Sequence, residues 1–125
     1  MLHPTEQLIE EIWEALGRVL DPCHQRSGHD LSILDLGLVN RVTPVADHIE
    51  IGLTLTEVSC VFAYLIIERI ESLAEDFPEV ARFRVIVEPL PSWTPDRLSE
   101  RARTSYRNSR TIYGSKLFKL LTSKT

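Results

Sequence analysis

The stretch HIEIGLTLTEVSCVFAYLIIERI, residues 48–70, decides the fold because its hydrophobic pattern changes period partway along. Over residues 49–55 every second residue is apolar, which is typical of a strand with one buried face. Over residues 62–70 apolar residues recur every three or four positions, which is typical of an amphipathic helix. The stretch therefore predicts a strand that leads into a helix, with Cys60 at the junction.

A first helix is expected upstream of this stretch. Residues 4–20 place apolar side chains at helical spacing and glutamates on the opposite face. The Asp21–Pro22 pair is expected to end this helix and to open a polar loop, DPCHQRSGHD, over residues 21–30.

Two further strands are expected on either side of the central one. A strand that ends near Pro44 is joined to it by a short connection, which predicts an antiparallel hairpin. Residues 81–89 are expected to form a third strand, which buries Phe83, Val85 and Val87 on one face.

A last helix is expected in the segment PSWTPDRLSERAR, residues 91–103. Thr94 suits the N-cap and Pro95 the first helical position. The resulting order α-β-β-α-β-α predicts an α+β fold with helices packed on one face of a small mixed sheet. We expect a single domain over residues 1–107, followed by a basic tail over residues 108–125.

Length and composition limit the function classes. With 125 residues, 43% of them hydrophobic, the chain has enough apolar material for one globular domain. It has no run of about 20 apolar residues that would span a bilayer, and its acidic start lacks the pattern of a secretory signal. Two cysteines are too few for a disulfide framework, so we expect reduced thiols and a cytoplasmic location.

The formal charge of −4 is unevenly distributed. From Arg97 onward eight Lys and Arg residues stand against one Glu, a formal charge of +7, so residues 1–96 carry −11. A basic tail can contact an acidic partner or the acidic body of its own chain, or remain solvated without a ligand. Only three aromatic side chains lie among its cations, which argues against nucleic acid as a partner.

The functional interpretation depends on Cys60. It follows Ser59, a good N-cap residue, so we expect it in the first helical turn, where free N–H groups and the helix dipole favour a thiolate. Such a thiolate would serve as a nucleophile or as a ligand for a soft metal. The alternative is a small core residue, because free cysteine is among the most buried residue types.

Three motifs, ILDLGLV (residues 33–39), LTLTEVSC (53–60) and PSWTPDRLSERAR (91–103), resemble in order and spacing the SufT/PaaD-like family of metal–sulfur cluster assembly factors. The resemblance covers roughly residues 6–103. It implies a non-enzymatic carrier or adaptor in the assembly or maturation of iron–sulfur or related metal centres. The cysteine that matches Cys60 is the functional thiol in that family.

The resemblance also implies residues that surround this thiol. Asp35 would be a functional carboxylate near it. Thr56, on the strand end that leads to Cys60, and Ser59, its expected N-cap, are supporting groups by their position in the sequence. The residues themselves allow other interpretations: Asp35 can cap a turn in which Gly37 takes a positive φ or relieves crowding, and Thr56 can be an ordinary strand former.

The chain departs from the family pattern in two places. The residues that flank Cys60 are not the usual prolines and glycine, and Cys23 stands where the family has an acidic residue. Cys23, His24, His29 and Asp30 lie together in the polar loop and are ligand types that hold zinc or iron. One interpretation is a metal set of Cys60, Cys23 and His29, and the other is a solvated loop without a ligand.

Two cysteines cannot supply the four thiolates of an ordinary cluster. We therefore expect a transient iron–sulfur cluster, or an iron or zinc ion, held with help from a second chain as a homodimer, from histidine or carboxylate ligands, or from a client's cysteines. The expected partners are client apo-metalloproteins and other cluster-assembly proteins, with no membrane.

Trp93, Arg97 and Arg101 make up the expected partner surface, although Trp93 can equally cover the edge of the core. A different class of function is a metal-free interaction module, such as an accessory subunit of a multicomponent oxygenase. A third is a thiol-dependent enzyme with Cys60 as nucleophile and a loop histidine as base.

Overall fold

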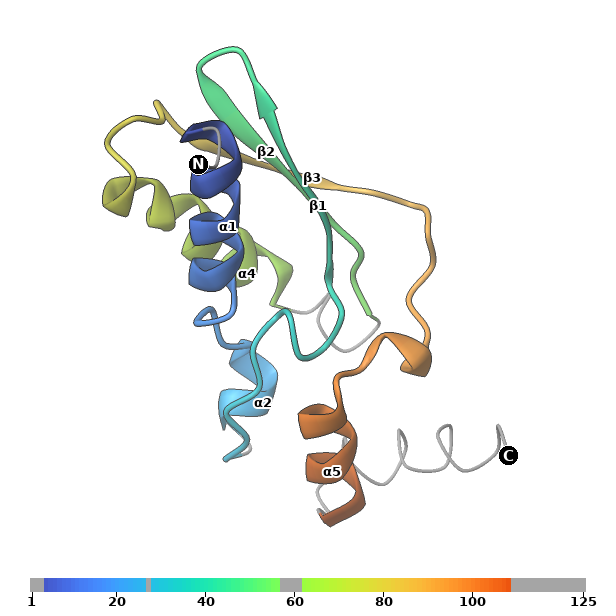
Figure 1. Ribbon diagram of the computed structural model, residues 1–125. Coiled ribbons are helices and arrows are strands. Elements are labelled where there is room, and N and C mark those ends of the chain that lie inside the picture. The colour runs from blue at the N-terminus through green and yellow to red at the C-terminus, as the bar shows by residue number, and fades with distance from the viewer. Residues whose placement is uncertain (1–3, 27, 57–61, 109–125) are drawn as a thin grey trace.

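The computed structural model describes residues 4–26, 28–56 and 62–108 (Figure 1). The expected order α-β-β-α-β-α is confirmed by the main elements, which are α1 (Pro4–Leu16), β1 (Val39–Val45), β2 (His48–Leu53), α4 (Ala63–Ser72), β3 (Phe83–Val87) and α5 (Glu100–Asn108). The short helix α2 (Pro22–Arg26) lies in the segment predicted as a loop, and the 3₁₀ turns η1 (Leu73–Asp76) and η2 (Pro95–Arg97) lie in segments predicted as α-helix.

The strands form one mixed sheet in the order β1-β2-β3. The predicted hairpin is confirmed, because β1 and β2 pair antiparallel with Val42 opposite Ile51. β3 pairs parallel to β2, with Val85 beside Ile51. The parallel pairing follows from α4, which lies between β2 and β3 in the chain and returns it to the same end of the sheet.

Helices α1 and α4 cover the same face of the sheet, as predicted (Figure 1). The core lies between them and the inward side chains of β2, and includes Ile12, Leu16, Ile49, Ile51, Leu53, Ile66 and Ile70. Because side chains alternate along a strand, residues such as Arg41, Thr43 and Glu50 project from the opposite face.

The helix after β2 begins later than expected. Its first residue is Ala63 and Phe62 occupies the N-cap position, so the predicted cap at Ser59 is three residues too early. Ser59 and Cys60 themselves lie outside the described residues. The predicted apolar stripe is confirmed, since Ile66 and Ile70 are buried and Phe77 packs on Phe83 with ring centroids 5.7 Å apart.

The last helix also begins later than expected. Thr94 makes no side-chain cap bond and precedes only η2, after which Leu98 is extended. α5 begins at Glu100, and the Ser99 hydroxyl accepts the N–H of Ala102 at 3.1 Å. Ser99 is therefore the N-cap of α5, a residue type that favours this position.

The burial predicted for the third strand is wrong at its last residue. Phe83 is buried and Val85 packs against the core, but Val87 is 47% exposed. β3 is an edge strand, so one side of Val87 has no neighbouring strand to cover it in the described part of the chain.

Candidate functional site

A tight turn before β1 is built by reciprocal hydrogen bonds between Ser32 and Asp35. The N–H and hydroxyl of Ser32 donate to Oδ2 of Asp35 at 3.1 and 3.2 Å, and the N–H of Asp35 donates to the Ser32 hydroxyl at 3.0 Å. Gly37 follows with a φ of 70°, and a Cβ there would collide with the backbone of Arg97. Both roles predicted for Gly37 are confirmed.

The C-terminal segment is fastened to this turn through Asp35. Ser99 donates its hydroxyl to Oδ1 of Asp35 at 2.8 Å and its N–H to the Asp35 carbonyl at 2.8 Å. Arg101 donates to Oδ2 at 2.6 Å. We call Ser32, Asp35, Ser99 and Arg101 the Asp35 clasp, because they join α5 to the turn before β1.

The clasp also sets the protonation of its carboxylate. Burial raises the pKa of Asp35, but hydrogen bonds from Ser32 and Ser99 and the charge of Arg101 outweigh it and hold the pKa below its ordinary value. Asp35 is thus a charged group whose partners come from its own chain, as expected for a turn cap.

The other two residues of the expected partner surface also bond within the chain. The indole N–H of Trp93 donates to the Leu36 carbonyl at 2.7 Å, and Nε of Arg97 donates to the Gly37 carbonyl at 2.7 Å. Trp93 packs against the core. These contacts favour the core-edge interpretation of Trp93 over a partner groove.

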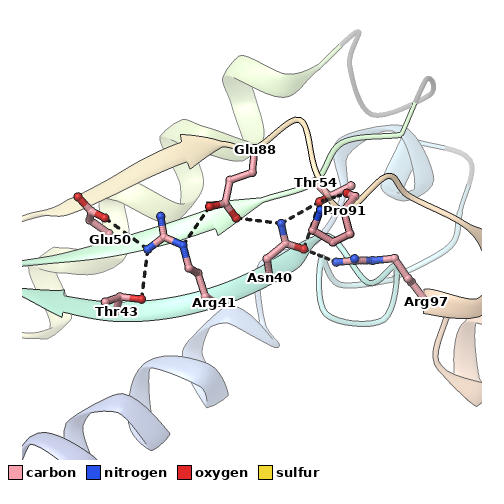
Figure 2. Close-up of polar contacts among 8 residues, drawn as sticks. All are labelled: Asn40, Arg41, Thr43, Glu50, Thr54, Glu88, Pro91 and Arg97. Atoms are coloured by element: carbon pink, nitrogen blue, oxygen red, sulfur yellow. Dashed lines mark hydrogen bonds and ion pairs between the residues drawn. The ribbon is translucent and has the colours of Figure 1, made fainter.

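A polar network at the end of the sheet joins all three strands to the C-terminal segment (Figure 2). The amide of Asn40 donates to the Thr54 hydroxyl at 2.8 Å and to Glu88 at 3.0 Å. The Thr54 hydroxyl donates to the backbone carbonyl of Pro91 at 2.8 Å, and Nη2 of Arg97 donates to the side-chain Oδ1 of Asn40. This Asn40 network fixes the chain at Thr54, the residue just after β2.

Arg41 extends the network across the exposed face (Figure 2). It donates to Glu88 at 3.0 Å, to Glu50 at 3.3 Å and to Thr43 at 3.2 Å. Hydrogen bonds from Asn40 and Arg41 lower the pKa of Glu88, and the bond to Glu88 raises the pKa of Arg41. Sequence reasoning missed this network, because its members lie far apart in the chain and form no motif.

The predicted polar loop contains a buried pair instead. Asp21 caps α2, since its Oδ2 accepts a hydrogen bond from the backbone N–H of His24 at 3.1 Å. The same oxygen lies 2.6 Å from Nδ1 of the His24 ring. Both side chains are almost fully buried. Oδ1 of Asp21 is buried and has no hydrogen-bond partner among the described residues. The Asp-Pro pair was the available signal, because it fits an N-cap followed by proline at the first helical position.

The histidine proposed as a metal ligand lies against α5. The Ser105 hydroxyl lies 3.0 Å from Nδ1 of His29. Cys60 and the side chain of Cys23 lie outside the described part, so the set of Cys60, Cys23 and His29 remains a prediction. Across residues 4–26, 28–56 and 62–108, no three His, Cys, Asp or Glu side chains are grouped to hold a metal ion.

No helix within the described ranges is long and apolar enough to cross a membrane.

Thr56 lies partly buried two residues beyond Thr54, in the last described segment before Cys60.

Comparison with known proteins adds to this geometry. A model of the family described as iron-sulfur cluster assembly protein matches residues 9–85. The chain is 36% identical over 99 residues to the Fe-S protein maturation auxiliary factor YitW of Bacillus subtilis. The aligned region covers 78% of this chain and 92% of that protein.

Two solved structures share the fold. A domain of unknown function, DUF59, from Bacillus anthracis superposes with a TM-score of 0.72 at 27% identity, over 83% of this chain and 95% of that one. A conserved hypothetical protein from Thermotoga maritima gives a TM-score of 0.62 at 26% identity, over 78% and 91%.

Proposed function

This chain belongs to the iron–sulfur cluster assembly protein family, and we propose that it acts there as a carrier or adaptor that delivers a cluster to client apo-proteins through Cys60. A general role in iron–sulfur assembly follows from the family. The cluster is cargo in this proposal, so the chain needs to hold it only transiently. The relative in Bacillus subtilis is named an auxiliary maturation factor, which supports a non-enzymatic role, and we expect that role in the cytoplasm.

One observation carries the proposal: the chain is firmly held on both sides of the short segment that contains Cys60. Thr54 is buried, and its N–H donates to the Leu38 carbonyl at 2.8 Å, in addition to the bonds of the Asn40 network. Six residues beyond Cys60, Ile66 of α4 is fully buried in the core. A functional group on a short connection between rigid elements is a common arrangement for binding sites.

The described residues also bear on which groups would assist the thiol. Asp35 forms an ion pair with Arg101 and accepts hydrogen bonds from two serines. We therefore assign it a structural role in the clasp and not a role as a ligand of the cluster. His29 remains a candidate ligand if its bond to Ser105 exchanges, and Cys23 remains one as the second thiol. With two cysteines per chain, the remaining ligands would come from the client.

Anaerobic reconstitution with iron and sulfide tests the loading step. We expect sulfur-to-iron charge-transfer absorption in the wild type and its loss in Cys60→Ser. Cys23→Ser removes the other thiol and leaves Cys60 in place, so its bands should weaken without being lost. Bands of equal strength in Cys60→Ser would remove the proposal and favour a metal-free interaction module.

Elemental analysis tests the loop ligands separately. After anaerobic loading with iron or zinc, we expect a lower metal content in Cys23→Ser and His29→Ala than in the wild type. Unchanged content in both variants would exclude these residues as ligands while leaving the role of Cys60 intact.

A further inference from the structure

The two edges of the sheet differ in their protection. β1 carries Pro44, which has no N–H to offer another strand, and α1 contacts β1. β3, with the sequence FRVIV, has neither proline nor a charge that points inward, and it consists mostly of strong strand formers. Native sheets usually block an edge of this kind, yet no strand pairs with it in the described part of the chain.

The hydrogen bonds of β3 show which of its backbone groups face outward. The Arg82 carbonyl accepts from Ile49 at 3.1 Å and the Glu88 N–H donates to Leu53 at 2.8 Å, so both point toward β2. In a parallel pair the residues that face the neighbour alternate. The N–H and C=O groups of Phe83, Val85 and Val87 therefore point away from β2, to the open edge.

The described segment directly after β3, residues 88–91, does not cover this edge. Glu88 reaches back across the sheet to Asn40 and Arg41, over Gly52, where a Cβ would meet the Glu88 carboxylate (Figure 2). Three residues later the Pro91 carbonyl accepts from Thr54 (Figure 2). The segment thus turns over β2 toward β1, and it leaves Val87 47% exposed.

The charges of β3 and its flanks are self-complementary. We infer that β3 pairs antiparallel with β3 of a second copy of this chain, with Val85 on the twofold axis. This register places the Cα of Arg82 opposite the Cα of Glu88 of the partner subunit and sets Arg84 diagonal to it, so the two arginine side chains extend along the outer face toward a carboxylate that leans over Gly52. Arg82 and Arg84 are exposed and make no salt bridge with any described residue. Parallel pairing in register would instead oppose like charges.

The same register completes the backbone and apolar contacts. The outward groups of Phe83, Val85 and Val87 would all find partners, and Phe83 would lie opposite the exposed Val87. A five-residue strand buries less than the roughly 800 Å² per partner of a standard interface, so we expect micromolar or weaker affinity.

This dimer is distinct from the proposed cargo site. β2 is parallel to β3, so in an antiparallel dimer the two β2 strands run in opposite directions. The chain ends that lead to the two Cys60 residues then point apart. The dimer would carry two separate sites and would not supply two thiols to one cluster, so it can exist whether or not Cys60 holds a cluster.

Sedimentation equilibrium and amide hydrogen exchange of the full chain over about 10 μM to 1 mM test the inference. We expect the average mass to rise toward that of a dimer. Exchange at Phe83, Val85 and Val87 should slow as concentration rises, while exchange at Arg84 and Ile86, already bonded to β2, changes little.

Two variants locate the contact. Arg82→Glu opposes two carboxylates, and Val87→Lys adds a charge at the exposed end of the strand, so each should raise the dimer Kd about tenfold. Arg107→Glu makes the same charge change on an exposed residue of α5 and should leave the Kd unchanged. A monomer at all concentrations, or a dimer that Arg82→Glu and Val87→Lys do not weaken, would overturn the inference. So would a monomer in which Val87→Lys lowers transfer to an apo-acceptor, because the edge would then serve a client strand.

Discussion

Asp21 and Asp35 each fix the turn in which they lie, but their surroundings differ. Asp35 accepts hydrogen bonds from Ser32, Ser99 and Arg101 through both oxygens. Asp21 is fully buried, uses one oxygen for His24, and has no hydrogen-bond partner for the other among the described residues. A buried polar atom without a partner costs stability. Asp35 is therefore a structural carboxylate whose two oxygens are both hydrogen-bonded. Burial of the second oxygen of Asp21 instead costs stability, which its bonds to His24 must offset.

Replacing Asp21 tests the buried side of this comparison and should have the largest effect. Asp21→Ala removes the N-cap of α2 and the buried carboxylate that accepts from Nδ1 of His24. We expect a loss of about 3 kcal/mol in the free energy of unfolding, measured with urea. Asp21→Asn keeps an acceptor and should lose clearly less. Equal losses in the two variants would contradict the role given to the Asp21–His24 pair.

Replacing Asp35 tests the satisfied side, with a somewhat smaller effect. Asp35→Ala removes the bonds that hold α5 to the turn before β1, and we expect a loss of about 2 kcal/mol. Hydrogen exchange of the α5 amides should accelerate more than exchange in β2. Asp30→Ala, the loss of an exposed carboxylate, is the control and should change neither quantity. An α5 as protected in Asp35→Ala as in the wild type would argue against the clasp.

The charge of Asp35 makes the clasp sensitive to pH. Its folded-state pKa is lowered, because hydrogen bonds from Ser32 and Ser99 and the charge of Arg101 outweigh the effect of burial. A carboxyl with a lowered pKa contributes stability above its unfolded pKa and loses it as pH falls through the folded pKa. The stability difference between wild type and Asp35→Asn should thus be constant near neutral pH and shrink below about pH 4. A difference that grows on acidification would contradict this sign.

The ion pair within the clasp should contribute least. Arg101 is 60% exposed, and exposed ion pairs are weak and screened by salt. Arg101→Gln should lower the free energy of unfolding by about 0.5 kcal/mol, and the loss should vanish in 1 M salt. A loss as large as that of Asp35→Ala would mean that charge, and not the serine hydrogen bonds, holds α5.

Most of the fold could be predicted because it rests on hydrophobic periodicity. The alternation from Ile49 to Leu53 and the helical stripe through Ile66 and Ile70 dictate the elements and the buried face. The first residues of the helices were harder to predict, because Ser59 and Thr94 belong to residue types that favour the N-cap as strongly as Ser99 does. Local propensity cannot rank such signals when tertiary contacts decide among them.

The site could be predicted only in part. The role of Gly37 followed from its place in a turn, and the structure confirms it. The Asn40 network depends on contacts between residues up to 57 positions apart, which no local pattern reveals. Likewise, Arg97 and Arg101 are basic residues that suggested a partner surface, and only the fold shows that they bond to Asn40 and Asp35.

Transfer of iron and sulfide to an apo-acceptor tests the central claim most directly. Wild-type protein loaded under anaerobic conditions is mixed with an apo-ferredoxin, and cluster formation on the acceptor is followed by its absorption. We predict that the loaded wild type transfers faster than free iron and sulfide at equal concentrations, and that Cys60→Ser shows no such advantage. Equal transfer by Cys60→Ser, or no advantage for the wild type, would contradict the carrier role.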